Sequence, residues 1–357
     1  MATTTTIQPI GIDDVVHVRG RHLVKKRDGS RFFVRGIAFP TPPGDGDGDD
    51  DDDAHDRRHR HGYDPRAWLA VLRQLRIDLG LEFNAVRLYR LRPEHVDYSE
   101  FFLGAASLGV YVIVPLTSAS GDGVLDRDAP APGCYPRRLF EYGASALSDQ
   151  YLRHPNVLAG VVGNEVMDGG VHFGAAPCVR AYSRDLKLFM DAMAANDDGA
   201  ALVHRRTLPL IYASQDSSPM GGAALDKDQA LRLTADYLTC VRDAGGGGSG
   251  AGGVGGENDD DDEEEDGKVI ARMQQRHDRM SPAVDIVGIN VESWCSSTQN
   301  YAYNRDGTPG PYYHLHEALE NASVPLIFTE VGTQNNSRAE CVVCAYILSP
   351  RFVRLRI

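Results

Sequence analysis

The chain has 357 residues, of which 42% are hydrophobic, and its formal net charge is −13. This length is enough for one large α/β domain or two smaller ones. The acidic residues gather in two segments: residues 44–61 hold eight Asp and three Arg, and residues 244–267 hold nine Asp or Glu without any Lys or Arg. The rest of the chain is close to neutral and carries no basic stripe, which argues against nucleic-acid binding.

Seven short apolar runs alternate with segments of helical periodicity after a polar stretch, residues 1–30, that has a turn at Gly29. The predicted strands are residues 31–39, 83–91, 110–116, 157–162, 208–213, 284–291 and 325–332. The predicted helices are, approximately, residues 65–80, 95–108, 136–153, 178–195, 227–242, 268–278 and 312–320. We expect the two acidic segments, 44–61 and 244–267, to be disordered inserts, because neither can bury apolar surface.

This alternation favours a (β/α)8 barrel of the TIM type over a doubly wound sheet. The eighth strand is a difficulty. The next apolar run, Cys341–Leu348, is separated from Gly332 by only eight residues, and a parallel crossover with its helix needs at least about ten. We therefore predict a catalytic barrel over residues 1–332 that lacks a regular eighth strand, followed by a divergent or truncated tail at 333–357.

Two of the predicted strands end in a glutamate. The run N-V-L-A-G-V-V-G-N-E-V ends in Asn164 and Glu165, and the run P-L-I-F-T-E-V-G contains Glu330. A single glutamate in such a place is more often a salt-bridge partner or a helix cap. At the C-terminal rim of a parallel barrel, however, catalytic groups gather. The pair therefore indicates an acid/base and a nucleophile for cleavage of a glycosidic bond.

No metal or organic cofactor is expected, because two carboxylates carry this chemistry. The run G-D-G-D-G-D-D-D-D-D lacks the spaced ligands and terminal Glu of an EF-hand loop. His55, His59 and His61 are better explained as solvated side chains than as metal ligands. The glycines of 244–267 do not follow a strand, so they do not form a phosphate-binding loop.

The residues alone give mixed indications of location. No run approaches the roughly 20 apolar residues that span a membrane, and neither a signal peptide at the start nor a lipid-anchor signal at the end is evident. Read literally, this predicts an intracellular chain. Six cysteines are equally compatible with a disulfide set in a secreted protein. They are Cys134, Cys178, Cys240, Cys295, Cys341 and Cys344.

Six segments, in order between about residues 31 and 332, resemble glycoside hydrolase family 72, the fungal-type β-1,3-glucanosyltransferases. They are R-F-F-V-R-G-I-A-F, N-A-V-R-L-Y, H-P-N-V-L-A-G-V-V-G-N-E-V, A-D-Y-L-T-C, D-I-V-G-I-N-V-E-S-W-C and P-L-I-F-T-E-V-G. The resemblance implies a retaining mechanism on a (β/α)8 barrel, with Glu165 as general acid/base and Glu330 as nucleophile. It implies β-1,3-glucan as donor and acceptor, no protein partner, and a cell-surface location, membrane-attached through a GPI anchor in the family.

Two polar residues are expected to support this pair. Arg87, at the end of the second predicted strand, could supply the positive charge that keeps Glu330 ionised. Asn164 could hydrogen-bond the 2-hydroxyl of the sugar, a contact that strengthens in the transition state.

Three further residues are candidates for substrate binding. Tyr89 and Trp294 could offer aromatic faces to sugar rings or could pack beneath the rim. Asn290 occupies a polar position at the end of a predicted strand, with the same two interpretations. All three sit in segments that resemble the family.

Some positions depart from the family pattern. Glu292 stands where the family usually has Tyr, and a carboxylate there would repel Glu330. Pro40 and Pro115 stand where the family usually has Gln and Asp. These departures keep one alternative open, a weak or inactive β-1,3-glucan-binding module. A plain retaining β-glucan hydrolase of a related barrel family is a further alternative.

Overall fold

The computed structural model describes residues 7–39, 64–118, 123–167, 172–195, 206–215, 227–239, 282–291, 319 and 322–331. The predicted inserts at 44–61 and 244–267 lie outside these ranges. So do the predicted helix at 268–278, most of the one at 312–320, and the tail at 333–357 with the candidate eighth strand.

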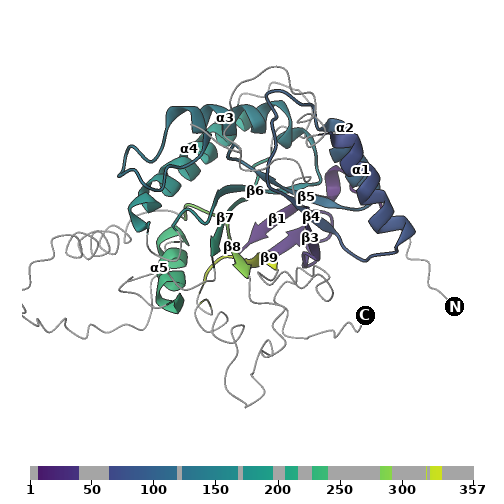
Figure 1. The fold of residues 1–357 in the computed structure, drawn as a ribbon. Helices are drawn as coiled ribbons and strands as arrows, with labels where there is room; N and C mark the ends of the chain where they lie inside the picture. The colour runs from purple at the N-terminus through teal and green to yellow at the C-terminus, as the bar shows by residue number, and fades with distance from the viewer. Residues whose placement is uncertain are drawn as a thin grey trace, which may run out of the picture.

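Seven parallel strands form one sheet, and their order in the sheet is their order in the chain. They are β3 (Gly36–Phe39), β4 (Ala85–Leu88), β5 (Tyr111–Pro115), β6 (Val157–Asn164), β7 (Leu210–Gln215), β8 (Ile286–Val291) and β9 (Leu326–Val331). Because β3 also contacts β9, the sheet curls into a nearly closed barrel (Figure 1). The predicted parallel barrel of the TIM type is thus confirmed. Each predicted strand overlaps one of the seven, although β6 and β7 each extend two residues beyond the predicted end.

The helices lie outside the barrel, between successive strands (Figure 1). They are α1 (Pro65–Arg73), α2 (Ser99–Ser107), α3 (Arg137–Asp149), α4 (Ala176–Ala195) and α5 (Lys227–Thr239). Short turns of 3-10 helix cover Ile12–Asp14, Tyr151–Arg153 and Phe173–Ala175, and a π-helical turn, Gln74–Asp78, extends α1.

Helix α1 shows how local sequence sets these boundaries. The Asp64 side chain accepts a hydrogen bond from the Arg66 backbone N–H, and Pro65 takes the first helical position, where a missing N–H costs nothing. Trp68 and Leu69 are buried against the neighbouring elements. A capped start and one apolar face therefore define this helix.

An antiparallel hairpin closes the N-terminal end of the barrel. Strands β1 (Val16–Arg19) and β2 (His22–Lys25) pair in register. Val16 and Leu23 belong to one buried cluster with interior barrel residues such as Ala85. We predicted only a polar stretch with a turn here, because each strand of the hairpin presents a single buried residue.

A buried arginine ties the start of β6 to the segment before β7. Arg206 is 8% exposed, and its guanidinium donates hydrogen bonds to the backbone oxygens of Tyr151, His154 and Val157. Its burial lowers the pKa of Arg206 to about 10. These three hydrogen bonds from one charged side chain join the turn Tyr151–Arg153 and the start of β6 to the segment before β7.

One disulfide crosses the helical layer. Cys134, in the loop before α3, is bonded to Cys178 near the start of α4. The bond fastens the connection after β5 to the connection after β6. The other four cysteines lie outside the described residues.

Candidate active site

The predicted site residues lie on strand ends that share one rim of the barrel. Arg87 is on β4, Asn164 ends β6, and Asn290 is on β8. Because all the barrel strands run parallel, their C-terminal ends meet at the same face. The structure brings these three residues together with Glu165 in one hydrogen-bonded cluster.

Glu165 is placed by an irregular end of β6. Val161 pairs with Ile211 and Gly163 with Tyr212, so Val162 is an extra residue in the ladder with β7. Such a bulge bends a strand and redirects the side chains that follow.

The backbone of Glu165 is itself unusual. Its φ is 53°, the one non-glycine residue with positive φ in the described part of the chain, and its N–H donates to the backbone oxygen of Ala213 at 2.8 Å. A non-glycine residue in this region costs about 1 kcal/mol or more, and such strain gathers at functional sites.

Asn290 lies at the centre of the cluster and is fully buried. Its amide nitrogen donates to Glu165 Oε1 at 2.6 Å and to Asn164 Oδ1 at 3.1 Å. Its amide oxygen accepts from Arg87 Nη1 at 3.1 Å and from Thr329 Oγ1 at 2.8 Å. Asn290 therefore lies at the predicted end of the barrel, but its side chain is buried below the exposed rim.

Arg87 organises the other side of the same cluster. Its side chain is 4% exposed, and Nη2 donates to Asn164 Oδ1 at 2.6 Å. The guanidinium lies 4.3 Å from the centre of the Tyr89 ring, a cation–π contact. One face of Tyr89 is thus occupied by Arg87, and only its other face could be offered to a sugar.

For the second carboxylate residue, Glu330, the structure gives the position of the backbone. Glu330 lies in β9 and is the register partner of Asn290 in β8, which places it at the same rim. The structure does not describe the Glu330 side chain. Trp294, Glu292 and Pro40 lie outside the described residues, whereas Pro115 is buried at the end of β5.

Two further residues of the site were not singled out from the sequence. The Tyr212 hydroxyl accepts the Met167 backbone N–H at 2.8 Å and so holds the chain that follows Glu165. Thr329 donates to Asn290. A polar residue inside a buried apolar strand, directly before a candidate catalytic Glu, was the available signal for Thr329.

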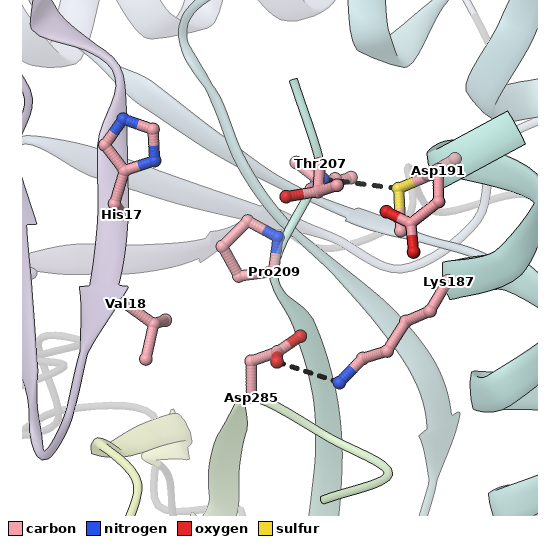
Figure 2. A pocket seen from close by; sticks show the side chains of 9 residues that line it. His17, Val18, Lys187, Asp191, Thr207, Pro209 and Asp285 are labelled. Carbon is pink, nitrogen blue, oxygen red and sulfur yellow. Dashed lines mark hydrogen bonds and ion pairs between the residues drawn. The ribbon is translucent and has the colours of Figure 1, made fainter. Parts of the chain in front are cut away.

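A pocket of about 280 Å³ lies at the opposite end of the barrel, between β1 and α4 (Figure 2). It is lined by His17, Lys187, Asp191 and Asp285 among others. Lys187 contacts Asp285 at 2.8 Å, and the other oxygen of Asp285 accepts the Leu210 N–H at 2.9 Å. These contacts link α4 to the starts of β7 and β8, which indicates a structural role.

Two negative findings concern the described residues only. They contain no group of three or more His, Cys, Asp or Glu side chains arranged to hold a metal ion. Within the same ranges, no helix is both long and apolar enough to cross a membrane.

A family model described as "Glucanosyltransferase", glycoside hydrolase family 72, matches residues 11–349. The chain belongs to this family. Among its curated relatives, the 1,3-beta-glucanosyltransferase gel2 of Aspergillus fumigatus is 25% identical over 322 residues, 89% of this chain and 50% of that protein. The 1,3-beta-glucanosyltransferase gas1 of Schizosaccharomyces pombe is 24% identical over 318 residues, 89% of this chain and 44% of that protein.

The fold of this family member is also that of solved structures. Saccharomyces cerevisiae Gas2p in complex with laminaripentaose matches with a TM-score of 0.59 at 20% identity, over 92% of this chain and 56% of that one. The chain spans about half the length of the curated relatives that it matches.

Proposed function

We propose that the chain carries the catalytic barrel of a retaining β-1,3-glucanosyltransferase, with residues 1–332 forming that barrel. The observation that carries this proposal is the hydrogen bond of 2.6 Å between the Asn290 amide and Glu165 Oε1. It holds a carboxyl group at the barrel rim, in a family that includes curated proteins named 1,3-beta-glucanosyltransferases. Glu330, the register partner of Asn290, supplies the second carboxyl group at that rim.

The reaction has two steps that conserve the anomeric configuration. Glu330 attacks the anomeric carbon of an internal β-1,3 linkage, and Glu165 donates its proton to the departing glucan oxygen. A hydroxyl of a second glucan chain then attacks the glycosyl-enzyme while Glu165 takes its proton, which frees Glu330. One β-1,3 linkage is broken and one is formed. β-1,3-Glucan is therefore both donor and acceptor.

The contacts of Glu165 suggest which oxygen carries the proton. Oε1 accepts an N–H from Asn290, and the carbonyl-type oxygen of a protonated carboxyl group is the natural acceptor. We therefore assign the transferred proton to Oε2. The same hydrogen bond persists when Glu165 is ionised and acts as a base.

Asn164 is suited to bind the 2-hydroxyl of the donor sugar. Its amide oxygen accepts from both Arg87 and Asn290, so its NH2 group is directed away from them. The side chain is exposed at the rim. A hydrogen bond from this group to the 2-hydroxyl would strengthen as the oxocarbenium-like transition state forms.

Arg87 is the cation of the described cluster. Because it donates to Asn164 and Asn290 from a buried position, it fixes both amides and adds positive charge beside the rim. We propose that this charge favours the ionised form of the nucleophile Glu330. The outer face of Tyr89, and Trp294, remain candidates for stacking on sugar rings.

Product analysis with a reduced β-1,3-gluco-oligosaccharide tests the proposal. We expect products longer than the substrate from the wild-type chain, and turnover at least about 10³-fold lower from Glu165→Gln, since general acid–base catalysis contributes roughly this much. Oligosaccharide affinity should change little in that variant, and its circular dichroism should match the wild type.

Each alternative predicts a different result in the same experiment. Shorter products alone would indicate a plain hydrolase. Binding without any products, from folded protein, would indicate a glucan-binding module.

We also propose that the protein works in an oxidising compartment at or outside the cell surface. The disulfide between Cys134 and Cys178 supports this, because stable disulfides are rare in the cytosol. Thiol labelling of protein isolated from its native source, with and without prior reduction, tests it. Free Cys134 and Cys178 before reduction would contradict the proposal.

A further inference from the structure

Thr329 is a buried polar residue that the reaction described above does not use. It directly precedes Glu330 on β9 and is 4% exposed. Its hydroxyl donates to Asn290 Oδ1 at 2.8 Å. The same Asn290 amide also donates to Glu165, which follows β6 on the other side of the site.

An irregularity in β9 places Thr329 in this position. In the ladder with β8, Ile289 pairs with Phe328 and Asn290 pairs with Glu330, so Thr329 is an extra residue without a register partner. Phe328 packs in an outer cluster. Thr329 follows it and, by the alternation of strand side chains, faces the barrel interior. The bulge thus presents the Thr329 hydroxyl to Asn290 and aligns Glu330 with the same residue.

The rotamer of Thr329 depends on a glycine on the neighbouring strand. A Cβ atom added to Gly288 would lie 2.5 Å from Thr329 Cγ2 and 3.0 Å from Thr329 Oγ1. The side chain of Thr329 therefore fills the space that Gly288 leaves open. Because a β-branched side chain has few χ1 options, a methyl group held over Gly288 keeps the hydroxyl directed at Asn290.

The amide of Asn290 has all four of its hydrogen-bonding positions in use. Arg87 can only donate, so the atom that faces it must be the amide oxygen. Thr329 fills the second acceptor position of that oxygen. The NH2 group is then directed at Glu165 and Asn164. With one acceptor contact removed, the amide plane could rotate at a smaller energetic cost.

We propose that Thr329 is a positioning residue for Glu165: through Asn290, the residue before the nucleophile holds the acid/base in place. This inference rests on the proposed function, since it takes Glu165 as the acid/base. The ends of β6 and β9 are then coupled, because one amide contacts both.

Two glucan donors distinguish this role from an effect on the adjacent Glu330. A natural glucan leaving group needs a proton from Glu165, whereas a dinitrophenolate leaving group does not. For Thr329→Val, which replaces the hydroxyl with a methyl group, we expect glycosyl-enzyme formation from a laminari-oligosaccharide to fall about 10-fold in single turnover. The burst of dinitrophenolate from a dinitrophenyl laminari-oligosaccharide should stay within about twofold. Thr329→Ser should recover most of the glucan rate.

Equal losses on both donors would overturn the proposal, because they would indicate damage to Glu330 or to the fold. An unchanged glucan rate in Thr329→Val would overturn it as well. Thr239→Val is a matched control. Thr239 is 2% exposed, and its hydroxyl donates to the Ala235 carbonyl within α5 at 2.7 Å. This substitution should lower stability without distinguishing the two donors.

A measurement without turnover separates this inference from the proposed function. If the wild-type chain acts on no glucan, the proposed function fails, and the link is tested by urea unfolding of Thr329→Val, Asn290→Ala and the double variant. Residues in contact should couple. Each variant lowers the folding equilibrium constant by some factor. We expect the factor for the double variant to be at least about fivefold smaller than the product of the factors for the two single variants. Coupling below twofold would overturn the link.

Discussion

The two ends of this barrel use buried polar groups in opposite ways. At the C-terminal rim, Arg87, Asn164, Asn290 and Glu165 contact one another, next to two bulged strands and one residue with positive φ. At the N-terminal end, a hairpin closes the barrel, and polar groups such as Arg206 bind backbone oxygens. Side chains that bind side chains can be aimed at a substrate. Side chains that bind backbone mainly hold strands in place.

The largest effect is expected from Arg206→Met, at the N-terminal end. The change removes three hydrogen bonds that a charged side chain donates to the backbone oxygens of Tyr151, His154 and Val157. A hydrogen bond to a charged group contributes about 1.5–3 kcal/mol, so we expect a loss of about 3–5 kcal/mol in the free energy of unfolding, measured in urea. The single-turnover rate per folded molecule should be close to that of the wild type. A rate loss above about tenfold would contradict the division between the two ends.

Asn290→Asp should show the reverse pattern at the C-terminal rim. The variant keeps the acceptor contacts with Arg87 and Thr329 but places an oxygen where an NH2 group faces Glu165 Oε1 at 2.6 Å. We expect turnover to fall about 100-fold, equivalent to about 2.7 kcal/mol, with a smaller change in unfolding free energy. Transfer assays and urea unfolding of the same preparation check this. A variant with full activity would show that the hydrogen bond to Glu165 is dispensable.

His154 should make stability depend on pH. Burial, followed by the charge of Arg206, lowers the pKa of His154 to about 4, although Asp97 acts in the opposite direction. Unfolded His154 has its ordinary pKa near 6.5, so between these values the unfolded chain binds more protons. Stability is therefore complete above about pH 6.5 and is lost as pH falls toward 4, by about 2 kcal/mol.

The variant His154→Phe isolates this effect. Its ring can keep the packing against Phe102, whose centroid lies 4.9 Å from that of His154. From pH 7 to pH 4, we expect the wild type to lose about 2 kcal/mol more of its unfolding free energy than the variant loses. A difference that is constant with pH would show that His154 does not titrate in this way.

The smallest effect is expected from Lys187→Met in the pocket at the N-terminal end. The ion pair with Asp285 has side chains that are 29% and 30% exposed, so solvent screens it and its loss should cost less than about 1 kcal/mol. Asp285→Ala should cost more, because that carboxylate also accepts the Leu210 N–H. Thermal unfolding of the two variants compares them, and equal losses would contradict this ranking.

The sequence by itself determined the barrel class, all seven strands and the five described helices. Each barrel strand comes from a short apolar run, and each of these helices has apolar periodicity, because burial on a sheet or on one helix face imposes that pattern locally. The two strand-end glutamates could be picked out for the same reason, since a carboxylate interrupts the apolar pattern. The hairpin β1–β2 escaped prediction because its stability depends on covering the barrel rather than on its own sequence.

The tertiary structure alone decided how the site residues are connected. Bulges at Val162 and Thr329 depend on the register of neighbouring strands, and register is not evident from one strand. Asn290 and Thr329 are far from Glu165 in sequence, and their roles depend on which amide atom faces Arg87. Such contacts follow from the closure of the barrel, which brings strand ends from distant parts of the chain within hydrogen-bonding distance.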